Sequence, residues 1–535
     1  MRILNLQQKN YKLGREEYQL KLPLDYEVII PENDSVRLLS QIIERMDLSE
    51  LYSAYSEQGR TPVPHPKSLF KVITYANMEG IYSTRKIESA CKRDVNFMWL
   101  LEGEKAPDHT SISRFRKDRL GGTMEGLFYQ LVRILHEISE VKYENLFEDG
   151  TTIEANASRY TAVWKKAIEK NEAKMHGRAE LIAEEINKLY FTEFRVLEET
   201  ANKDMYDMTV FLERKMQEQG IEAVSGAGKR KSNEQKLLEA LREYRNRQLS
   251  YDESKEQFEG RSSYSKTDPD ATFMRMKDDH MKTGQLKPGY NVQLAVEAEY
   301  VIGAGVFSTC SDTVTMKPML DKILQYNSDV TIKRFIADAG YESEENYSYL
   351  AEKGIDFYIK PKTYEQQKKH SFKEDIGKRE NMIYNAETDE YTCHNRKQLK
   401  AVGTFNKEST TGYVSEVTVY ECEGCNACPY KDKCTKAEGN KRMEVSKVLV
   451  EHRQKSYENI TSETGILLRV NRSIQSEGAF GVLKEDRQFS RFLTRGKPNV
   501  LTEILLLCFG YNVNKLHAKI QSERCGKDLH EIKAA

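Results

Sequence analysis

The stretch FIADAGYESEENYSYL (residues 335–350) combines an apolar strand, a glycine turn and the start of a helix. Asp338 stands directly after the apolar residues. Ser343 and the two glutamates after it are typical of a capped helix start, because acidic side chains stabilise the first turn. A carboxylate in this position is either an acidic turn residue or one ligand of a metal ion whose other ligands lie elsewhere in the chain.

The segments around this stretch alternate between strand-like and helix-like patterns. Residues 289–308 alternate around a turn, and residues 315–327 have the pattern of an amphipathic helix. The strand that ends at Asp338 is followed by a helix over 344–354 and another strand over 355–362. This order predicts a mixed α/β sheet. Function in such sheets gathers at the carboxyl ends of strands, where Asp338 lies.

Composition indicates a soluble globular protein of several domains. The chain has 535 residues, of which 39% are apolar and 31% charged, so we expect roughly two to four domains. The longest apolar run, ILLLCFGYNV (504–513), is too short to span a bilayer, and the first residues lack the apolar region of a signal peptide. Nine cysteines without a secretion signal favour reduced thiols or metal ligands over disulfides. We therefore expect a cytoplasmic protein with no membrane partner.

Local basic clusters, rather than net charge, are the sequence evidence for a nucleic-acid partner. The net charge is only −1, but SRFRKDR (113–119), TRKIESACKR (84–93) and GKRK (228–231) concentrate Lys and Arg. The first two lie among short helices that resemble helix-turn-helix DNA readers, with a plain helical bundle as the alternative. A solvated helix face is the simpler interpretation of GKRK. The candidate DNA contacts belong to the first cluster: Arg114, Arg116 and Lys117.

A second acid stands in NLFEDGTTIEANASRYT (145–161). This sequence predicts a short strand, a turn at Asp149-Gly150 and a further extended segment. Since Asp-Gly is a common hairpin turn, this pair alone is more simply explained by local structure than by catalysis.

A third acid lies in a segment with helical periodicity, residues 465–492. Glu477 and Lys484 are seven positions apart and so share one helix face, two turns from each other. Gly478 and Gly481 each cost about 1 kcal/mol in a helix interior, which suggests that another group approaches this face closely. For Glu477 alone, an exposed Glu–Lys helix face is the alternative.

Taken together, these motifs resemble those of bacterial insertion-sequence DDE transposases, which have a ribonuclease H-like catalytic domain. The matching text follows the family's order and comprises DGTTIEANAS, KTDPDATFMRMK (266–277), GYNVQLAV, DAGYESEENYSYL and RSIQSEGAFGVLK. Residues 60–120 also resemble the family's helical N-terminal domain. The resemblance implies that Asp149, Asp338 and Glu477 form the catalytic triad.

The same resemblance implies DNA-binding roles for Arg472 and Lys484, the basic residues on either side of Glu477. Related enzymes often have a tyrosine, then this arginine, then three residues before the glutamate. Here four residues separate Arg472 from Glu477, and Arg469 stands where the tyrosine is usual.

The implied chemistry suits three carboxylates. Two Mg²⁺ (or Mn²⁺) ions held by Asp149, Asp338 and Glu477 would activate water or a 3′-hydroxyl for phosphodiester displacement. None of the ten histidines lies in these motifs. Lys484 would hold a phosphate of DNA as a point charge. We therefore expect a DDE transposase that acts on transposon terminal repeats and target DNA, as a dimer or larger assembly. The alternatives are a non-cutting DNA-binding protein and a nuclease of the same fold without strand transfer.

A cysteine cluster lies apart from the three acids. The spacing C-x₂-C-x₂-C-x₅-C, with one more cysteine upstream, is typical of a metal site. Structural zinc is the favoured ion, and an iron–sulfur cluster and reduced free thiols are the alternatives. The candidate zinc ligands are Cys393, Cys422, Cys425, Cys428 and Cys434.

Composition and motifs together predict five parts. The fold class expected is α/β, a ribonuclease H-like mixed sheet with a helical N-terminal domain and two insertions. Long charged helices predict a helical hairpin for the first insertion, and short strands with the cysteines predict a strand-rich second one. The predicted parts are an N-terminal DNA-binding domain (1–140), a catalytic core (141–161, 262–360 and 456–520), the hairpin (162–261), the strand-rich insertion (361–455) and a C-terminal tail (521–535).

Overall fold

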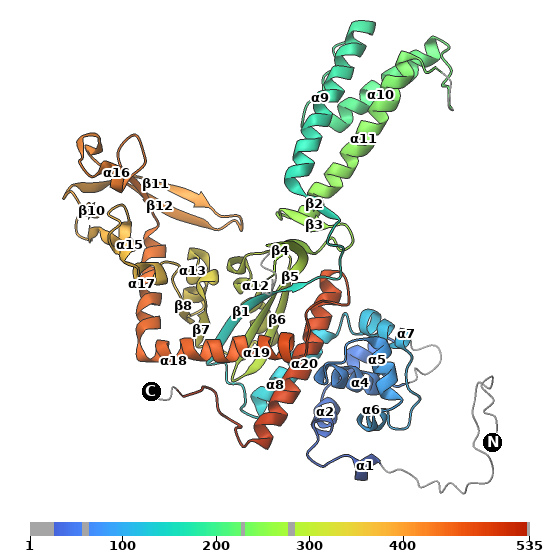
Figure 1. Ribbon diagram of the computed structural model, residues 1–535, viewed down its shortest axis with the longest axis vertical. Coiled ribbons are helices and arrows are strands. Elements are labelled where there is room, and N and C mark those ends of the chain that lie inside the picture. Colours follow the sequence, from blue (N-terminus) through green and yellow to red (C-terminus); the bar gives the residue numbers. More distant parts are fainter. Residues whose placement is uncertain (1–25, 56–63, 226–229, 277–283, 532–535) are drawn as a thin grey trace, which may run out of the picture.

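A six-stranded mixed sheet forms the centre of the molecule (Figure 1). The structure is a computed structural model that describes residues 26–55, 64–225, 230–276 and 284–531. Along one path the strands are β6 (Tyr300–Phe307), β5 (Leu286–Glu297), β1 (Asn145–Glu154), β7 (Arg334–Ala337) and β8 (Asp356–Ile359), and β4 (Thr272–Arg275) also pairs with β5. The pairs β6–β5 and β5–β1 are antiparallel, whereas β1–β7 and β7–β8 are parallel. The predicted mixed α/β sheet is confirmed.

The local patterns around Asp338 are also confirmed. The turn between β5 and β6 is made by Ala298 and Glu299, both at positive φ. The predicted helices are α12 (Met316–Tyr326) and α13 (Glu344–Glu352). Ser343 caps α13, because its hydroxyl accepts a hydrogen bond from the Asn346 N–H.

The predicted turn at Asp149-Gly150 is wrong, because β1 runs without a break through both residues. Gly150 pairs with Gln293 of β5, and this pairing, which continues on both sides of Gly150, keeps the chain extended. Glycine is needed here for space rather than for a turn. A Cβ atom on Gly150 would lie 2.2 Å from Gln293 Nε2 and 2.9 Å from Asp312 Oδ1.

We expect Gly150→Ala to destabilise the protein by about 1–3 kcal/mol, because the added methyl group must displace a buried, hydrogen-bonded glutamine. Urea unfolding of the variant against wild type measures the loss. Gly403→Ala is the matched control, since Gly403 also lies in a strand but has nothing within 4 Å of the added Cβ. Equal stabilities for the two variants would contradict the steric role of Gly150.

One hydrophobic core joins the sheet to the N-terminal helices through α20 (Lys497–Gln521). This helix contains the apolar run 504–513, which is buried, and it packs on β6 and on α4. The N-terminal helices are α1 (Tyr26–Ile29), α2 (Ser35–Glu44), α3 (Ser49–Ser53), α4 (Pro66–Met78), α5 (Thr84–Cys91), α6 (Val95–Leu100), α7 (His109–Arg114) and α8 (Met124–Glu137). No helix in the described ranges is both long and apolar enough to cross a membrane.

The first insertion is an arm of three helices that projects from the sheet (Figure 1). The predicted two-helix hairpin is therefore wrong, since α10 (Ala201–Glu218) packs between the ends of α9 (Lys165–Tyr190) and α11 (Asn233–Phe258). The arm has its own core, to which α10 contributes Met205, Met208, Leu212 and Met216. The short strands β2 (Ala162–Trp164) and β3 (Ser263–Ser265) pair at its base.

The second insertion carries a separate five-stranded antiparallel sheet with its own small core. Its strands, in the order of pairing, are β13 (Arg442–Val445), β12 (Val414–Cys422), β11 (Gln398–Glu408), β10 (Glu390–Thr392) and β9 (Ile383–Asn385). Three short helices accompany it: α14 (Tyr364–Gln367), α15 (His370–Lys373) and α16 (Lys431–Cys434).

The predicted helix over 465–492 exists but is irregular and ends at residue 486. After α17 (Lys447–Thr461), it runs as α18 (Glu463–Arg472), a π-helical turn η6 (Ser473–Glu477), α19 (Gly478–Gly481) and a second π-helical turn η7 (Val482–Asp486). The chain then becomes extended, and Arg491 forms a β-bridge with Glu154 at the end of β1. The acid-bearing part of this helix therefore lies against the central sheet.

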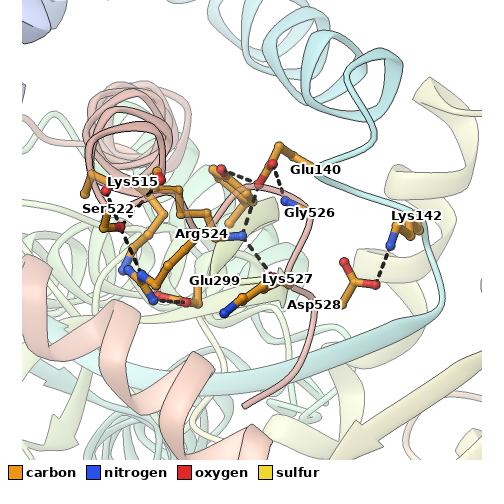
Figure 2. A network of polar contacts seen from close by, with 12 residues as sticks. Glu140, Lys142, Glu299, Lys515, Ser522, Arg524, Gly526, Lys527 and Asp528 are labelled. Carbon is orange, nitrogen blue, oxygen red and sulfur yellow. Dashed lines mark hydrogen bonds and ion pairs between the residues drawn. The ribbon is translucent and has the colours of Figure 1, made fainter. Parts of the chain in front are cut away.

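The C-terminal tail is tied to the core rather than free (Figure 2). The Gly526 N–H donates to Glu140, and Asp528 forms an ion pair with Lys142. Residues 532–535 of the predicted tail, residues 1–25 of the predicted N-terminal domain, Gly228 and Lys229 of GKRK, and Lys277 lie outside the described residues.

Candidate functional site

The first two predicted acids lie level with each other on neighbouring parallel strands. β1 pairs with β7 so that Asn145 is opposite Arg334 and Phe147 opposite Ile336. Continuing this register by two residues brings Asp149 opposite Asp338. Adjacent strands are roughly 5 Å apart, so the two acids are neighbours although 189 residues separate them in sequence.

Both acids face the helix that carries the third. Side chains alternate along a strand, so Asp149 shares a face with Phe147 and Asp338 shares one with Ile336. Phe147 and Ile336 belong to a buried cluster with Leu468 of α18. The helix that continues from Leu468 therefore passes over the face on which Asp149 and Asp338 lie.

Arg472 bridges the first and third acids. Its Nη1 atom is 3.8 Å from Asp149 Oδ2, and its Nη2 atom is 3.3 Å from Glu477 Oε1. The Ser473 hydroxyl donates a second hydrogen bond to Glu477, at 2.8 Å. Asp149 is 13% exposed and Glu477 is 55% exposed, so the site lies at the protein surface with one acid set into it.

The π-helical turn Ser473–Glu477 explains the unusual spacing between Arg472 and Glu477. A π-helical turn spans one residue more than an α-helical turn. The fourth intervening residue is therefore absorbed by the wider turn, and the two side chains still meet. Such turns inside α-helices occur frequently at functional sites.

Asp149, Glu477 and Lys484 line one open pocket of about 200 Å³. Lys484 Nζ donates to the Thr151 hydroxyl on β1 at 3.1 Å, which ties the second π-helical turn to the strand. Asp338 lies at the carboxyl end of β7, where its Oδ1 accepts a hydrogen bond from the Gly340 N–H at 2.7 Å. The structure thus brings together Asp149, Glu477, Arg472 and Lys484, whereas Asp338 lies beside Asp149 by strand register and does not line this pocket.

A buried polar network behind the pocket was missed by sequence reasoning. Asp312 lies before α12, and its Oδ1 accepts from Asn291 Nδ2 at 2.7 Å and from Gln293 Nε2 at 2.8 Å. The Tyr341 hydroxyl donates to Gln293. The only sequence signal was an acid between a strand and a helix start, the same setting as Asp338.

A carboxyl group and a phenol group of this region have raised pKa values. Burial first, and then the nearby Asp312 and Asp149, raise the pKa of Glu148 well above its ordinary value. Burial and the charges of the surrounding acids, Glu148 and Asp312 first among them, likewise raise the pKa of Tyr341. Both shifts favour the uncharged form of the side chain, next to Asp149 on β1.

The basic residues of the N-terminal helices divide into exposed and buried ones. Arg114 and Lys117 are exposed and stay candidates for DNA contact. The prediction for Arg116 is wrong: it is 7% exposed, and its guanidinium donates to the Tyr82 carbonyl oxygen. Burial lowers the pKa of Arg116. None of these three residues lines the pocket of Asp149.

The five predicted zinc ligands line a second, enclosed cavity of about 20 Å³ in the strand-rich insertion. Neither cluster shows a finished metal site. Within the described ranges, no three or more His, Cys, Asp or Glu side chains are arranged so as to hold a metal ion.

Two family models match the chain. A transposase DDE domain matches residues 392–517, which include Glu477, Arg472, Lys484 and the cysteine cluster. A transposase domain (DUF772) matches residues 24–118 in the N-terminal helices. The first match does not reach Asp149 or Asp338. No curated protein and no solved structure matches the chain.

These two matches, at the N-terminal helices and at the helix of Glu477, support the class of transposases. More particularly, the pairing of a DDE domain with this N-terminal domain supports an insertion-sequence DDE transposase.

Proposed function

We propose that this protein cuts DNA at transposon ends and transfers the freed strands into target DNA. The observation that carries the proposal is the register of β1 and β7, which makes Asp149 and Asp338 neighbours beneath the helix of Glu477. Asp338 follows the carboxyl end of β7, where open α/β folds bind ligands, and Asp149 lies beside it within β1. Arg472 links Asp149 to Glu477, so three acids far apart in sequence lie around one region of the sheet.

The pocket suits hard divalent cations. A guanidinium already bridges Asp149 and Glu477, so a positive charge is accommodated between these two carboxylates. The donors offered by the three acids are carboxylate oxygens, which Mg²⁺ and Mn²⁺ prefer. Asp149, Asp338 and Glu477 would hold the ions. Bound in pairs, such ions activate the attacking hydroxyl and stabilise the leaving oxygen.

The protein's own cations would bind the DNA backbone. Lys484 lines the pocket beside Thr151, from which it reaches a phosphate as a point charge. Arg472 presents a planar fork that suits bidentate phosphate binding. The exposed Arg114 and Lys117 would contact DNA further away, on the N-terminal helices.

The wider assignments form part of the same proposal. In the central sheet, β6, β5 and β1 pair antiparallel, and β7 and β8 continue it in parallel with β1. This arrangement supports a ribonuclease H-like catalytic core. The N-terminal helices, the arm and the strand-rich insertion are proposed as parts serving DNA binding and assembly. Joining two DNA ends to a target requires two active sites, so the active form is a dimer or larger.

Cleavage of a labelled duplex that carries the sequence flanking the gene tests the proposal. With Mg²⁺ we expect nicking at the end and, when a second duplex is supplied, joined product. Glu477→Gln is expected to lower the cleavage rate by about 100-fold or more, since it removes a charged oxygen ligand. Glu485→Gln is the matched control, because Glu485 lines the same pocket from the same helix.

Each other outcome selects an alternative. Cleavage without joined product would favour a nuclease of this fold. Tight binding of the end without cleavage would favour a non-cutting DNA-binding protein. Equal losses in Glu477→Gln and Glu485→Gln would contradict a specific role for Glu477.

A further inference from the structure

The cysteines of the strand-rich insertion converge from four places in the sequence on one cavity. One lies after β10, one ends β12, two begin and follow the short 3₁₀ turn Cys425–Ala427, and one ends α16: Cys393, Cys422, Cys425, Cys428 and Cys434. The cavity is about 20 Å³, close to the space of a single water-sized sphere. All five are free thiols, so no disulfide explains their convergence.

Two tight turns of the backbone place these cysteines around the cavity. Gly424 has φ +72°, a left-handed conformation that glycine adopts without strain, and it bends the chain between Cys422 and Cys425. On the facing side, the Cys393 N–H donates to the Lys397 carbonyl oxygen and closes the turn between β10 and β11. Two tight turns therefore face each other across the cavity.

Donors and cations surround the sulfurs. The Lys441 N–H donates to Cys425 Sγ at 3.4 Å, and Asn395 Nδ2 donates to Cys428 Sγ at 3.5 Å. Three lysines also line the cavity: Lys397, Lys431 and Lys441. Sulfur accepts such bonds best as a thiolate, and nearby cations offset the negative charge of several thiolates around one divalent ion.

The insertion has few apolar residues with which to hold its strands. Its core cluster contains seven buried residues, and two of them are cysteines of this group. Small modules with so little buried apolar surface are commonly stabilised by a metal ion. A metal ion bound by these cysteines would stabilise the insertion in place of a larger hydrophobic core.

We propose that Cys393, Cys425, Cys428 and Cys434 bind one structural Zn²⁺ ion, with Cys422 as a core residue. Four cysteine sulfurs make a closed tetrahedral zinc site. Cys422 is set apart because it belongs to the regular strand β12, pairs with Leu399 and is 2% exposed. Since the thiols of the described structure are not arranged around a common point, they must rotate inward and lose their protons when the ion binds.

The ion would fix the root of a long β-hairpin that reaches the catalytic region. β11 and β12 run from the cysteine cavity to a tip at Thr411 and Tyr413. The Tyr413 hydroxyl lies 3.2 Å from Ser348 Oγ, and Thr411 donates to Glu345, both on α13. Because α13 follows Asp338 directly, the metal site would brace the segment that carries this acid.

Metal content of the purified full-length protein tests the inference independently of any DNA activity. We expect about one zinc per chain in wild type and in Cys422→Ser, and an about tenfold drop in Cys428→Ser and Cys434→Ser. Cys310→Ser is a further control, because Cys310 is exposed and lies outside the cavity. Wild-type protein produced in cells supplied with Co²⁺ should show the visible absorption of a tetrahedral thiolate complex. This measurement does not depend on the folding of any variant.

Wild-type protein without bound zinc and without that Co²⁺ spectrum would overturn the proposal. Iron in place of zinc would overturn it too, in favour of an iron–sulfur cluster. Loss of zinc in Cys422→Ser to the level of Cys428→Ser would overturn the choice of ligands.

Discussion

Cleavage of end DNA is expected to fall by about 1000-fold or more when Asp149 is replaced by asparagine. Asparagine keeps the size of the side chain but removes its charge. Asp149 lies between the other two acids. It is level with Asp338, which follows β7, and it is 3.8 Å from Arg472, which also binds Glu477. Loss of one charged metal ligand removes several kcal/mol of transition-state stabilisation, and each 1.36 kcal/mol is tenfold in rate. Single-turnover nicking with Mg²⁺ measures the effect, and a gel-shift assay should show that DNA is still bound.

The neighbouring residue on the same strand provides a matched control. Glu148 is fully buried on the opposite face of β1, and neither of its carboxyl oxygens has a hydrogen-bond partner among the described residues. Burial raises its pKa and so favours the protonated form, which glutamine matches in shape and charge. We expect Glu148→Gln to cleave within a few-fold of wild type. A loss as large as that of Asp149→Asn would mean that cleavage does not depend on the charge facing the pocket.

The elements around the site were predictable because their signals are local. Alternation in 289–308, helical spacing in 315–327 and the Ser343 cap depend on a few consecutive residues, and the structure confirms each of them. The apolar run 504–513 was equally clear, because a helix that is apolar on all sides must be buried.

The errors come from features that depend on distant partners. Asp149-Gly150 has the local pattern of a turn, but pairing with the distant strand β5 keeps it extended. Arg116 belongs to a basic run, and a run of charges does not reveal which helix face is covered by the rest of the protein. The missed α10 has its apolar face against α9 and α11 of the same arm, which lie before and after it in the chain.

The site itself was only partly accessible from sequence. Motifs indicated the three acids, but the strand offset that sets Asp149 beside Asp338 cannot be read from either motif. The extra residue between Arg472 and Glu477 looked like a departure from the family, and only the π-helical turn shows how both side chains still meet. Asp312 was passed over because its partners, Asn291 and Gln293, lie on a strand that precedes it.

Lys519→Met is expected to destabilise the protein by about 3–5 kcal/mol, because it leaves a buried glutamate without its cation. Lys519 and Glu140 are 1% and 3% exposed, and Lys519 Nζ lies 3.1 Å from Glu140 Oε2. The Tyr300 hydroxyl and the Gly526 N–H also donate to this carboxylate. Urea unfolding measures the loss. The matched control is Lys142→Met, which breaks the more exposed pair with Asp528 and should cost below about 1 kcal/mol.

The loss should depend on pH in a defined direction. Burial alone would raise the pKa of Glu140, but the hydrogen bonds from Tyr300, Lys519 and Gly526 outweigh it and lower the pKa below its ordinary 4.5. A lowered folded-state pKa contributes stability above pH 4.5, and this contribution is lost as the pH falls through the folded value. The difference between wild type and Lys519→Met should therefore be largest near neutral pH and shrink in acid. The loss of unfolding free energy in Lys519→Met could instead be the same near neutral pH and in acid, or no larger than the loss in Lys142→Met. Either result would contradict a stabilising role for the buried pair of Lys519 and Glu140.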